Sequence, residues 1–340
     1  MLICMLVISI MNHLKNKYNP SVHKPLIVTP IYIPPECDHP DPPHPVLLKH
    51  EFTLGLVAPK GSGKTTVMIN LLNFYKNYFH NIYIFSPSID SDEKWDWLKK
   101  QKLLQENKPL KKWIAAETLK RDRMIQNQVI QDPTVNSKDF TNKNKEKEIF
   151  TGIIPDECFH HTYSHDVFVA ILKKKEKVIQ ALKKAGKTKY IADRDLYLFD
   201  DLVGSPMFSL EKNNPFKIFA TRHRHYTASA MIVTQAYKEW NSTVRTNLSG
   251  LIIFSVANDA EVKKIYEENT MGLHLDDWLE LYEHAIKEDF SFFYLNSQKP
   301  RGERVMKNFD TYLKVENKEE EEKVDNNIEQ EFIKNKKIKL

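Results

Sequence analysis

A glycine-rich segment of eight residues, APKGSGKT, constrains the fold of this chain more than any other feature. It runs from Ala58 to Thr65 and matches the phosphate-binding P-loop pattern, with alanine in place of the usual first glycine. A short apolar run, Phe52 to Val57, precedes it, and apolar residues at helical spacing follow from Thr65 to Tyr75. Strand, loop and helix in this order provide the context that the chemistry needs, because the loop must turn its backbone N–H groups toward a phosphate at a helix N-terminus.

The residue types in this segment predict how a nucleotide is bound. Lys64 is placed to neutralise charge on the β- and γ-phosphates, and the Thr65 hydroxyl is placed to ligate Mg²⁺. The predicted nucleotide-binding residues are Pro59, Lys60, Gly61, Ser62, Gly63, Lys64, Thr65 and Thr66. We therefore expect ATP and Mg²⁺ as the cofactors.

An apolar strand that ends in two carboxylates is the second signal. Residues 196–199 are apolar, and Asp200 and Asp201 follow them. Ligands bind at the carboxyl edge of a parallel sheet, so we expect Asp200 to hold Mg²⁺, directly or through water, and Asp201 to polarise an attacking water molecule. The alternative is a strand-ending turn with two solvated aspartates. Because activation of water favours ATP hydrolysis over transfer to an acceptor, the pair predicts an ATPase.

A third strand supplies a polar amide at the same edge. Gln235 ends the predicted strand 231–234, where its side chain can contact the γ-phosphate and the attacking water. Alone this signal is weak, since polar residues at strand ends are common. Its value comes from order, because such ATPases present a P-loop strand, an Asp-Asp strand and a Thr-Gln strand in this sequence.

Two arginines are candidates for completing the site of a neighbouring subunit. A guanidinium supplied in trans stabilises the negative charge that develops on the γ-oxygens. Arg245 lies shortly after Gln235, and Arg224 lies in the basic stretch 221–225. For each arginine, a surface salt bridge or a contact to a DNA phosphate is the alternative interpretation.

The remaining pattern alternates strands with helices, which favours a mostly parallel sheet with helices on both faces. Further strands are predicted at Asn81–Ser86, Asp195–Phe199, Ala228–Thr234 and Gly250–Val256, with an edge strand at Phe290–Leu295 and helices at Asp259–Glu268 and Leu275–His284. A charged, mostly helical insertion spans about 92–193, with helices at Glu93–Leu104 and His165–Lys184 and a polar middle at Asn136–Glu148. The predicted fold class is therefore α/β: a P-loop NTPase of the additional-strand, RecA-like type.

The predicted domains are an apolar N-terminus and proline-rich extended arm over 1–45, an ATPase domain over 46–313, and a charged, disordered tail over 314–340. Residues 1–11 are apolar but too short for a membrane helix, so we interpret them as a buried strand or as residues upstream of a true start at Met5 or Met11. Three scattered cysteines predict a reducing, intracellular location and no secretion. The net charge of +5 arises from 50 basic and 45 acidic residues, which permits a DNA partner without requiring one.

Two groups of residues in the insertion are interpreted as structural rather than as binding sites. Cys158 lies near three histidines, His160, His161 and His165, but the group lacks the paired spacing of a zinc site, so we interpret it as a loop of the insertion. Three tryptophans of the insertion are predicted to anchor its helices by packing: Trp95, Trp97 and Trp113.

With these residues in place, the sequence resembles the poxvirus-type genome-packaging ATPases of large DNA viruses, virophages and Maverick/Polinton-like elements, within the FtsK-HerA superfamily. The matching stretches are 58–70, 81–87, 199–203, 220–226, 232–237, 245–254 and 279–285. The resemblance implies a homo-oligomeric ring, hexameric or pentameric, that threads double-stranded DNA through a central pore, with a capsid protein as a further partner and no membrane. It also implies action at the viral assembly site or in the host nucleus or cytoplasm. The alanine at 58, the long insertion and the apolar N-terminus depart from the family pattern.

Three alternatives remain open beside a packaging motor. The chain could be a DNA-segregation or helicase-type translocase of the same superfamily, a P-loop kinase, or a protein whose nucleotide site is a switch without turnover. The Asp-Asp pair and the strand-end glutamine argue against a kinase. A motor hydrolyses ATP continuously, whereas a switch protein does not. Stimulation of hydrolysis by DNA would distinguish the motor from a kinase.

Overall fold

The computed structural model describes residues 38–131 and 150–315. The apolar start of the chain, most of the proline-rich stretch, the polar middle of the insertion and most of the charged tail lie outside these residues. The predicted domain boundaries therefore stay predictions.

A sheet of nine strands forms the centre of the described part of the chain, in the order β3-β2-β4-β5-β1-β6-β7-β8-β9. The strands are β1 (Thr53–Val57), β2 (Asn81–Phe85), β3 (Phe159–His160), β4 (Asp195–Asp200), β5 (Ala228–Thr234), β6 (Gly250–Ile253), β7 (Phe293–Asn296), β8 (Val305–Lys307) and β9 (Thr311–Tyr312). All pairings from β3 through β6 are parallel, and β7, β8 and β9 add antiparallel strands beyond β6. The mostly parallel α/β sheet expected from the sequence is confirmed.

Strand β5 lies between the P-loop strand β1 and the Asp-Asp strand β4, and it pairs with both. Val57 of β1 pairs with Thr234, and Asp200 of β4 pairs with Val233. An extra strand between these two is the feature that defines the additional-strand class. The predicted RecA-like arrangement is therefore confirmed, and the ends of β1, β5 and β4 meet at one edge.

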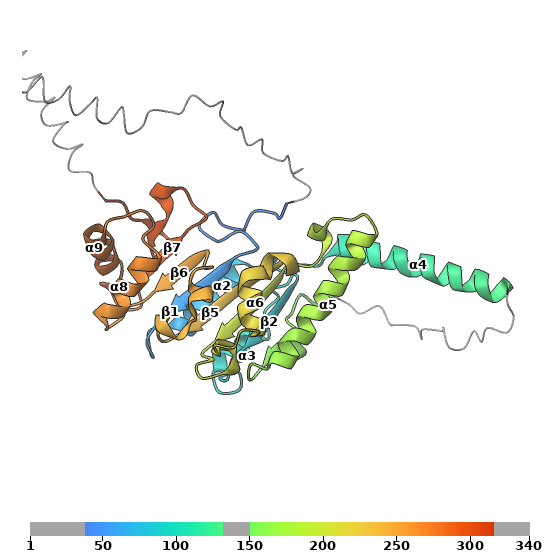
Figure 1. Cartoon of the computed structure of the whole chain (residues 1–340), viewed down its shortest axis with the longest axis horizontal. Coiled ribbons are helices and arrows are strands. Elements are labelled where there is room, and N and C mark those ends of the chain that lie inside the picture. Colours follow the sequence, from blue (N-terminus) through green and yellow to red (C-terminus); the bar gives the residue numbers. More distant parts are fainter. Residues whose placement is uncertain (1–37, 132–149, 316–340) are drawn as a thin grey trace, which may run out of the picture. The chain divides into compact units, whose positions relative to one another are not determined.

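Helices cover both faces of the sheet (Figure 1). The helices are α2 (Lys64–Phe74), α3 (Glu93–Leu98), α4 (Lys108–Gln131), α5 (His165–Lys184), α6 (Pro215–Arg222), α7 (Ser242–Arg245), α8 (Asp259–Glu268) and α9 (Leu275–Ala285). Short 3₁₀ turns lie at η3 (Asp156–Cys158), η4 (Lys189–Ile191), η5 (Pro206–Phe208), η6 (His223–Tyr226), η7 (Tyr237–Glu239) and η8 (Arg301–Glu303).

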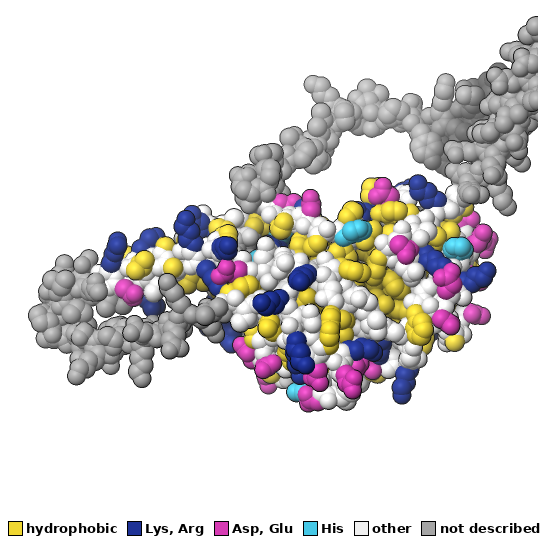
Figure 2. Space-filling view, turned by 180° about the vertical axis from the view of Figure 1, so that it is seen from behind, with side chains coloured by type: hydrophobic (Ala, Val, Ile, Leu, Met, Phe, Trp, Pro, Cys, Tyr) yellow, Lys and Arg dark blue, Asp and Glu magenta, His cyan; other side chains and the backbone are white. Residues whose placement is uncertain are grey.

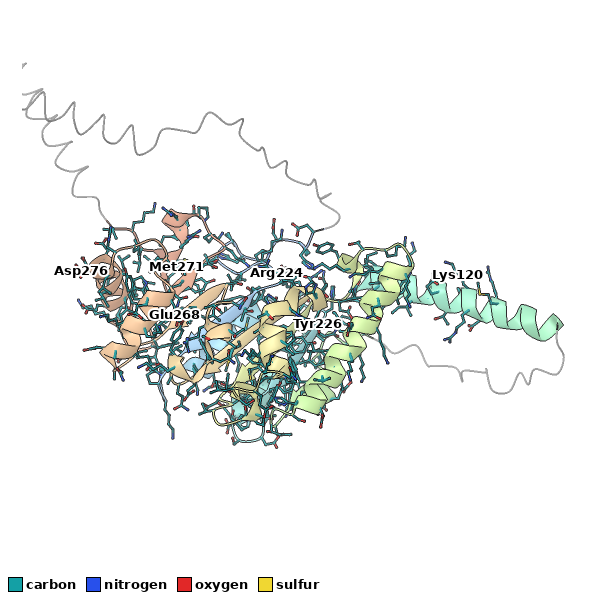
Figure 3. The ribbon with its side chains drawn as sticks, viewed as in Figure 1. Lys120, Arg224, Tyr226, Glu268, Met271 and Asp276 are labelled. Atoms are coloured by element: carbon teal, nitrogen blue, oxygen red, sulfur yellow. The ribbon has the colours of Figure 1, made fainter. Side chains whose placement is uncertain are left out.

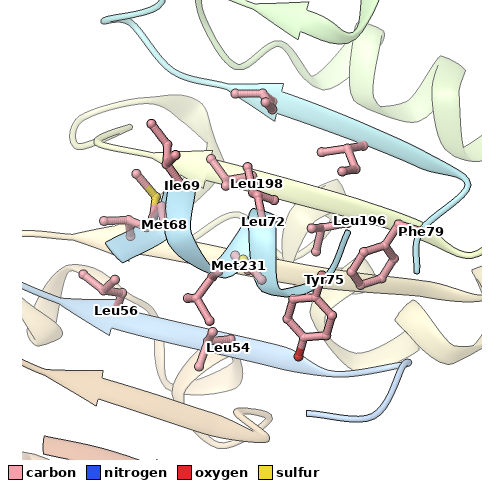
Figure 4. Packing of buried hydrophobic residues seen from close by; sticks show 14 of the residues in the cluster. Leu54, Leu56, Met68, Ile69, Leu72, Tyr75, Phe79, Leu196, Leu198 and Met231 are labelled. Atoms are coloured by element: carbon pink, nitrogen blue, oxygen red, sulfur yellow. The ribbon is translucent and has the colours of Figure 1, made fainter. Parts of the chain in front are cut away.

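Alternation along each strand divides the apolar side chains between two cores, since successive strand residues point to opposite faces. On one face, α2 and α3 pack against alternate residues of the central strands. Figure 4 shows part of this core, in which Met68, Ile69 and Leu72 of α2 lie over Leu54, Leu198 and Met231. The other face contributes Tyr197, Phe199, Ile232, Ile253 and Phe293 to a core with α5, α6, α8 and α9. Parallel strands buried on both faces explain the continuous apolar runs in the sequence.

The predicted edge strand is wrong in its position. Residues 290–295 correspond to β7, which pairs with β6 on one side and β8 on the other, so β9 forms that edge. Strands β8 and β9 have three and two residues, which is too short for a period-2 pattern to stand out.

The inserted region also contributes to the sheet, because β3 pairs with β2. Of its predicted helices, α5 has the predicted bounds, whereas α3 ends at Leu98 and the long α4 was not predicted. Trp95 is completely buried, as expected of a packing anchor, and Trp113 packs at the side of a small core between α4 and α5. Trp97 is exposed, so its predicted packing role is wrong.

Candidate nucleotide-binding site

The loop between β1 and α2 takes a shape that only glycine adopts without strain. Gly61 has φ +84° and Gly63 has φ +90°, and Ser62 closes the turn by donating from its backbone N–H (3.3 Å) and its hydroxyl (2.8 Å) to the Pro59 carbonyl. Gly63 precedes the first residue of α2, and no side chain caps this helix. The N–H groups of the first turn are therefore available to an anion, and the helix dipole favours negative charge there.

Alanine at the first P-loop position is explained by burial. Ala58 is completely buried, and its backbone N–H donates to the Thr234 carbonyl at 3.1 Å. Its methyl group therefore belongs to the core beneath the loop rather than to the phosphate-binding surface. The other predicted binding residues follow the loop outward: Pro59, Ser62, Lys64 and Thr65 are half-buried, and Lys60, Gly61 and Thr66 are exposed.

Lys64, Asp201 and Gln235 form one connected group at the carboxyl edge of the sheet. The Lys64 ammonium lies 3.2 Å from Asp201 Oδ2. The Gln235 amide donates to both Asp201 oxygens, at 2.9 Å to Oδ1 and 3.2 Å to Oδ2. Asp201 has φ +49°, a left-handed conformation that costs free energy in a non-glycine residue and is frequent at functional sites. The structure thus brings together three residues predicted separately from three segments.

Asp200 lies beside this group and is almost fully buried. Its Oδ2 accepts a hydrogen bond from the Ser86 hydroxyl at 3.0 Å, whereas its buried Oδ1 has no hydrogen-bond partner within the described part of the chain. Burial raises the pKa of Asp200 to about 6, and the negative charge of Asp201 acts in the same direction, while Lys64 and Ser86 lower it. A buried carboxylate oxygen without a donor fits a hard cation such as Mg²⁺.

A chain of hydroxyls orients Asp200, and sequence reasoning did not identify it. Ser86 follows β2, the strand next to β4, and its hydroxyl also lies 3.0 Å from the hydroxyl of Ser88. The Trp95 indole N–H donates to Ser88 at 3.0 Å. The signal for Ser86 was its place directly after a buried strand, where polar side chains reach the same edge as Asp200.

Arg245 is held inside its own chain. Its Nε donates to Glu268 Oε2 at 2.8 Å and a terminal nitrogen donates to Oε1 at 3.2 Å, while its guanidinium also bonds the Trp240 carbonyl and lies 5.5 Å from the centre of the Tyr237 ring. Glu268, at the end of α8, is labelled in Figure 3. This two-bond pair is the geometry of a strong intramolecular salt bridge.

Arg224 lies at the opposite edge of the sheet from the P-loop. It is exposed in the turn η6, which precedes β5, whereas Gln235 follows the end of that strand. Figure 3 labels Arg224 with Tyr226 of the same turn. A strand of seven residues spans roughly 20 Å, so Arg224 is remote from the site of its own chain.

The cysteine and histidines of the insertion make separate contacts. Cys158 is buried, His160 stacks on Phe85, His161 pairs with Asp90, and His165 contacts the Pro206 carbonyl. Among the residues that the structure describes, no group of three His, Cys, Asp or Glu side chains is placed to hold a metal ion. In the same residues, no helix has the length and apolar character needed to cross a membrane.

Comparisons with known proteins give one family match and several distant structural similarities. The family model described as "Type III restriction enzyme, res subunit" matches residues 8–188, more than half of the chain, including the P-loop. No curated protein matches the sequence.

Three solved structures with distant similarity to the chain each have a TM-score below 0.5. The genome packaging NTPase of Sulfolobus turreted icosahedral virus 2, in complex with sulfate, is 10% identical, with 78% of this chain and 97% of that chain covered and a TM-score of 0.43. The DNA-packaging ATPase of Sulfolobus turreted icosahedral virus is 12% identical, with 78% and 98% covered and a TM-score of 0.41. The pCW3 conjugation coupling protein in its monomer form is 10% identical, with 73% and 59% covered and a TM-score of 0.38.

The matched residues include the P-loop, whose geometry fits the binding of a phosphate at the N-terminus of α2. The chain therefore belongs to the family described as the res subunit of type III restriction enzymes, and it is a P-loop ATPase of α/β fold.

Proposed function

We propose that this ATPase translocates double-stranded DNA and packages a viral or virus-like genome into a capsid. The observation that carries the proposal is the bonded group of Lys64, Asp201 and Gln235 at the carboxyl edge of an additional-strand sheet. Such a group couples a water-activating carboxylate to a residue that can report the state of the γ-phosphate, which is what a motor needs and a simple phosphate-binding protein does not.

The residues would divide the chemistry as follows. Phosphates bind at the N-terminus of α2, where Lys64 offers its ammonium and the loop offers backbone N–H groups. A phosphate that bonds Lys64 competes with Asp201 for the ammonium, so Asp201 gains freedom to orient the attacking water. Thr65 and Asp200 would hold Mg²⁺, which supplies neutralisation of phosphate charge when bound. Gln235 keeps Asp201 in place through two hydrogen bonds and changes partners when the γ-phosphate is lost.

Strand β5 offers a direct link from this site to a basic surface. Its seven residues are all buried, with Gln235 after one end and the exposed side chains of Arg222 and His225 before the other. Basic side chains at this position suit contacts to the phosphate backbone, which bind DNA with little sequence preference. On the face that Figure 2 shows, basic and acidic side chains are interspersed, so a local turn rather than a uniformly basic face is proposed as the contact.

The proposed motor is a ring of identical subunits. We place the ATP site between subunits of a pentameric or hexameric ring, with an arginine supplied by the neighbouring subunit. Arg224 suits this role better than Arg245, since Arg224 is exposed and Arg245 is bound to Glu268 of its own chain. The stretches that resemble poxvirus-type packaging ATPases support a capsid protein as partner and action at the viral assembly site in the host nucleus or cytoplasm.

Movement along DNA can be tested with a linear duplex that carries a third strand, bound as a triplex, at one end. A protein that translocates along the duplex displaces this third strand. The wild type should displace it only with ATP, and Asp201→Asn should not. Asp276→Asn, the same chemical change at an exposed position on α9, serves as the matched control and should behave as the wild type. Hydrolysis of ATP without any displacement would contradict the translocase proposal.

A further inference from the structure

Phe290 combines two features that are unusual for a phenylalanine. Its side chain is 70% exposed, although it lies in the apolar run that leads into β7. Its backbone has φ +62°, in the left-handed region that bulky residues avoid. A strained conformation that exposes an aromatic ring costs free energy twice, and such positions cluster where a protein binds a ligand.

The Phe290 ring lies against the P-loop. A β-carbon added to Gly63 would stand 3.3 Å from Phe290 Cδ1, so the ring is in contact range of the glycine that precedes α2. Gly63 also has φ +90°, which makes a side chain at this position doubly unfavourable. The glycine therefore permits both the turn of the loop and the close approach of the ring.

The segment that carries Phe290 is held firmly on both sides. Ser291 donates to the Glu288 carbonyl from its backbone N–H (3.2 Å) and its hydroxyl (2.6 Å). Phe292 exchanges two hydrogen bonds with Asn308, at 3.1 and 2.9 Å, and Lys307 pairs with the Glu288 carboxylate at 2.7 Å. These contacts fix the backbone on both sides of Phe290, which reduces the ordering that the segment must undergo when a ligand binds.

The sheet gives the site two chemically different sides. On the β5 and β4 side of the P-loop strand lie Gln235, Asp201 and Asp200, which act on the terminal phosphate. On the other side lie β6 and β7, and because β7 is antiparallel to β6 its first residues are at the same edge as the P-loop. A nucleotide whose terminal phosphate faces the carboxylates must extend its nucleoside in the other direction, toward Phe290.

We propose that Phe290 forms one wall of the nucleobase subsite and stacks on the base of the bound nucleotide. The inference rests on the proposed function only in requiring that nucleotides bind at the P-loop. Stacking on an aromatic face depends on ring area and not on hydrogen-bond pattern. Purine nucleotides therefore bind better than pyrimidine nucleotides, with little preference for ATP over GTP from this residue.

Calorimetric measurement of the binding of MgADP and of magnesium tripolyphosphate, which has phosphates but no base, separates the contribution of the base to affinity from that of the phosphates. Phe290→Ala should weaken MgADP binding by about tenfold and leave tripolyphosphate binding unchanged, and Phe290→Trp should retain MgADP binding. Phe74→Ala is the matched control, since it removes another exposed phenylalanine at the far end of α2 and should change neither.

The strained backbone supplies a second, independent readout. Asparagine tolerates positive φ, so Phe290→Asn should leave the Tm unchanged or slightly raised while MgADP binding still falls about tenfold. A lower Tm together with equal losses for both ligands would show that Phe290 supports the loop and would overturn the inference. Unchanged MgADP binding in Phe290→Ala would also overturn it, while leaving the proposed function intact. If the wild type bound neither ligand, the nucleotide site itself would be refuted.

Discussion

Gly55, in the middle of β1, is expected to tolerate no side chain because Trp240 packs directly against it. A β-carbon at Gly55 would lie 2.7 and 2.8 Å from two atoms of the Trp240 ring and 3.0 Å from a methyl group of Leu251. All three residues are buried, and Trp240 is completely buried, so the ring cannot swing into solvent. Gly55→Ala must therefore displace either the tryptophan or the strand that leads into the P-loop.

The size of the effect follows from overpacking in a well-filled core, which typically costs about 1–3 kcal/mol. For a domain of this size each kcal/mol lowers the Tm by about 2–4 °C, so a fall of about 2–12 °C is expected in thermal unfolding followed by circular dichroism. Gly302→Ala is the matched control, because nothing lies within 4 Å of its added carbon, and it should be neutral or stabilising by up to about 1 kcal/mol.

A double-mutant cycle makes the test specific to the contact. Trp240→Phe removes the ring atoms that Gly55→Ala would strike, so the double variant should be more stable than the sum of the single effects by about 1–2 kcal/mol. An unchanged Tm in Gly55→Ala, or additive losses in the double variant, would refute the packing argument.

The pH dependence of stability, the binding of Mg²⁺ and the role of the half-buried Arg245 can each be tested by substitution. Burial holds the pKa of His50 well below 6.5, so below about pH 6.5 the unfolded chain binds a proton that the folded chain does not, and stability falls as the pH falls. Urea titrations at several pH values should show that the free energy of unfolding changes with pH more steeply in the wild type than in His50→Gln, by up to about 1.4 kcal/mol per pH unit. Ser86→Ala removes the hydroxyl that Asp200 accepts from, so the Mg²⁺ concentration for half-maximal ATP hydrolysis should rise about tenfold with little loss of Tm; an unchanged Mg²⁺ requirement would contradict the assigned metal ligand. Arg245→Ala and Glu268→Ala should each cost about 1–3 kcal/mol of stability, and the double variant should cost little more than either. If Arg245→Ala abolished ATP hydrolysis and Glu268→Ala did not, Arg245 would instead be the arginine that acts in trans.

The central sheet could be predicted because its strands carry strong local patterns. The seven buried residues of β5 and the amphipathic helices α5 and α8 have the predicted bounds. Each is bounded by residues that end the pattern, such as the Asn258 cap of α8. Their order along the chain was sufficient to predict that polar residues at the strand ends would meet.

The parts that could not be predicted depend on contacts between distant segments. Phe290 reads as the start of a strand, because an apolar run does not reveal that its first residue turns outward with positive φ. Arg245 is separated from Glu268 by 23 positions, and no local pattern connects them. Ser86 gains its meaning only when β2 is known to lie beside β4. In each case the missing information is which elements become neighbours.

Steady-state ATP hydrolysis, measured with and without long double-stranded DNA, shows whether this ATPase is a motor that acts on DNA. The wild type should hydrolyse ATP faster when DNA is present. Lys64→Ala and Asp201→Asn should abolish turnover in both conditions, while Asp276→Asn retains it. Hydrolysis that is absent, or that persists in Asp201→Asn, would contradict the assignment of this edge of the sheet as the catalytic site, and hydrolysis indifferent to DNA would contradict the motor.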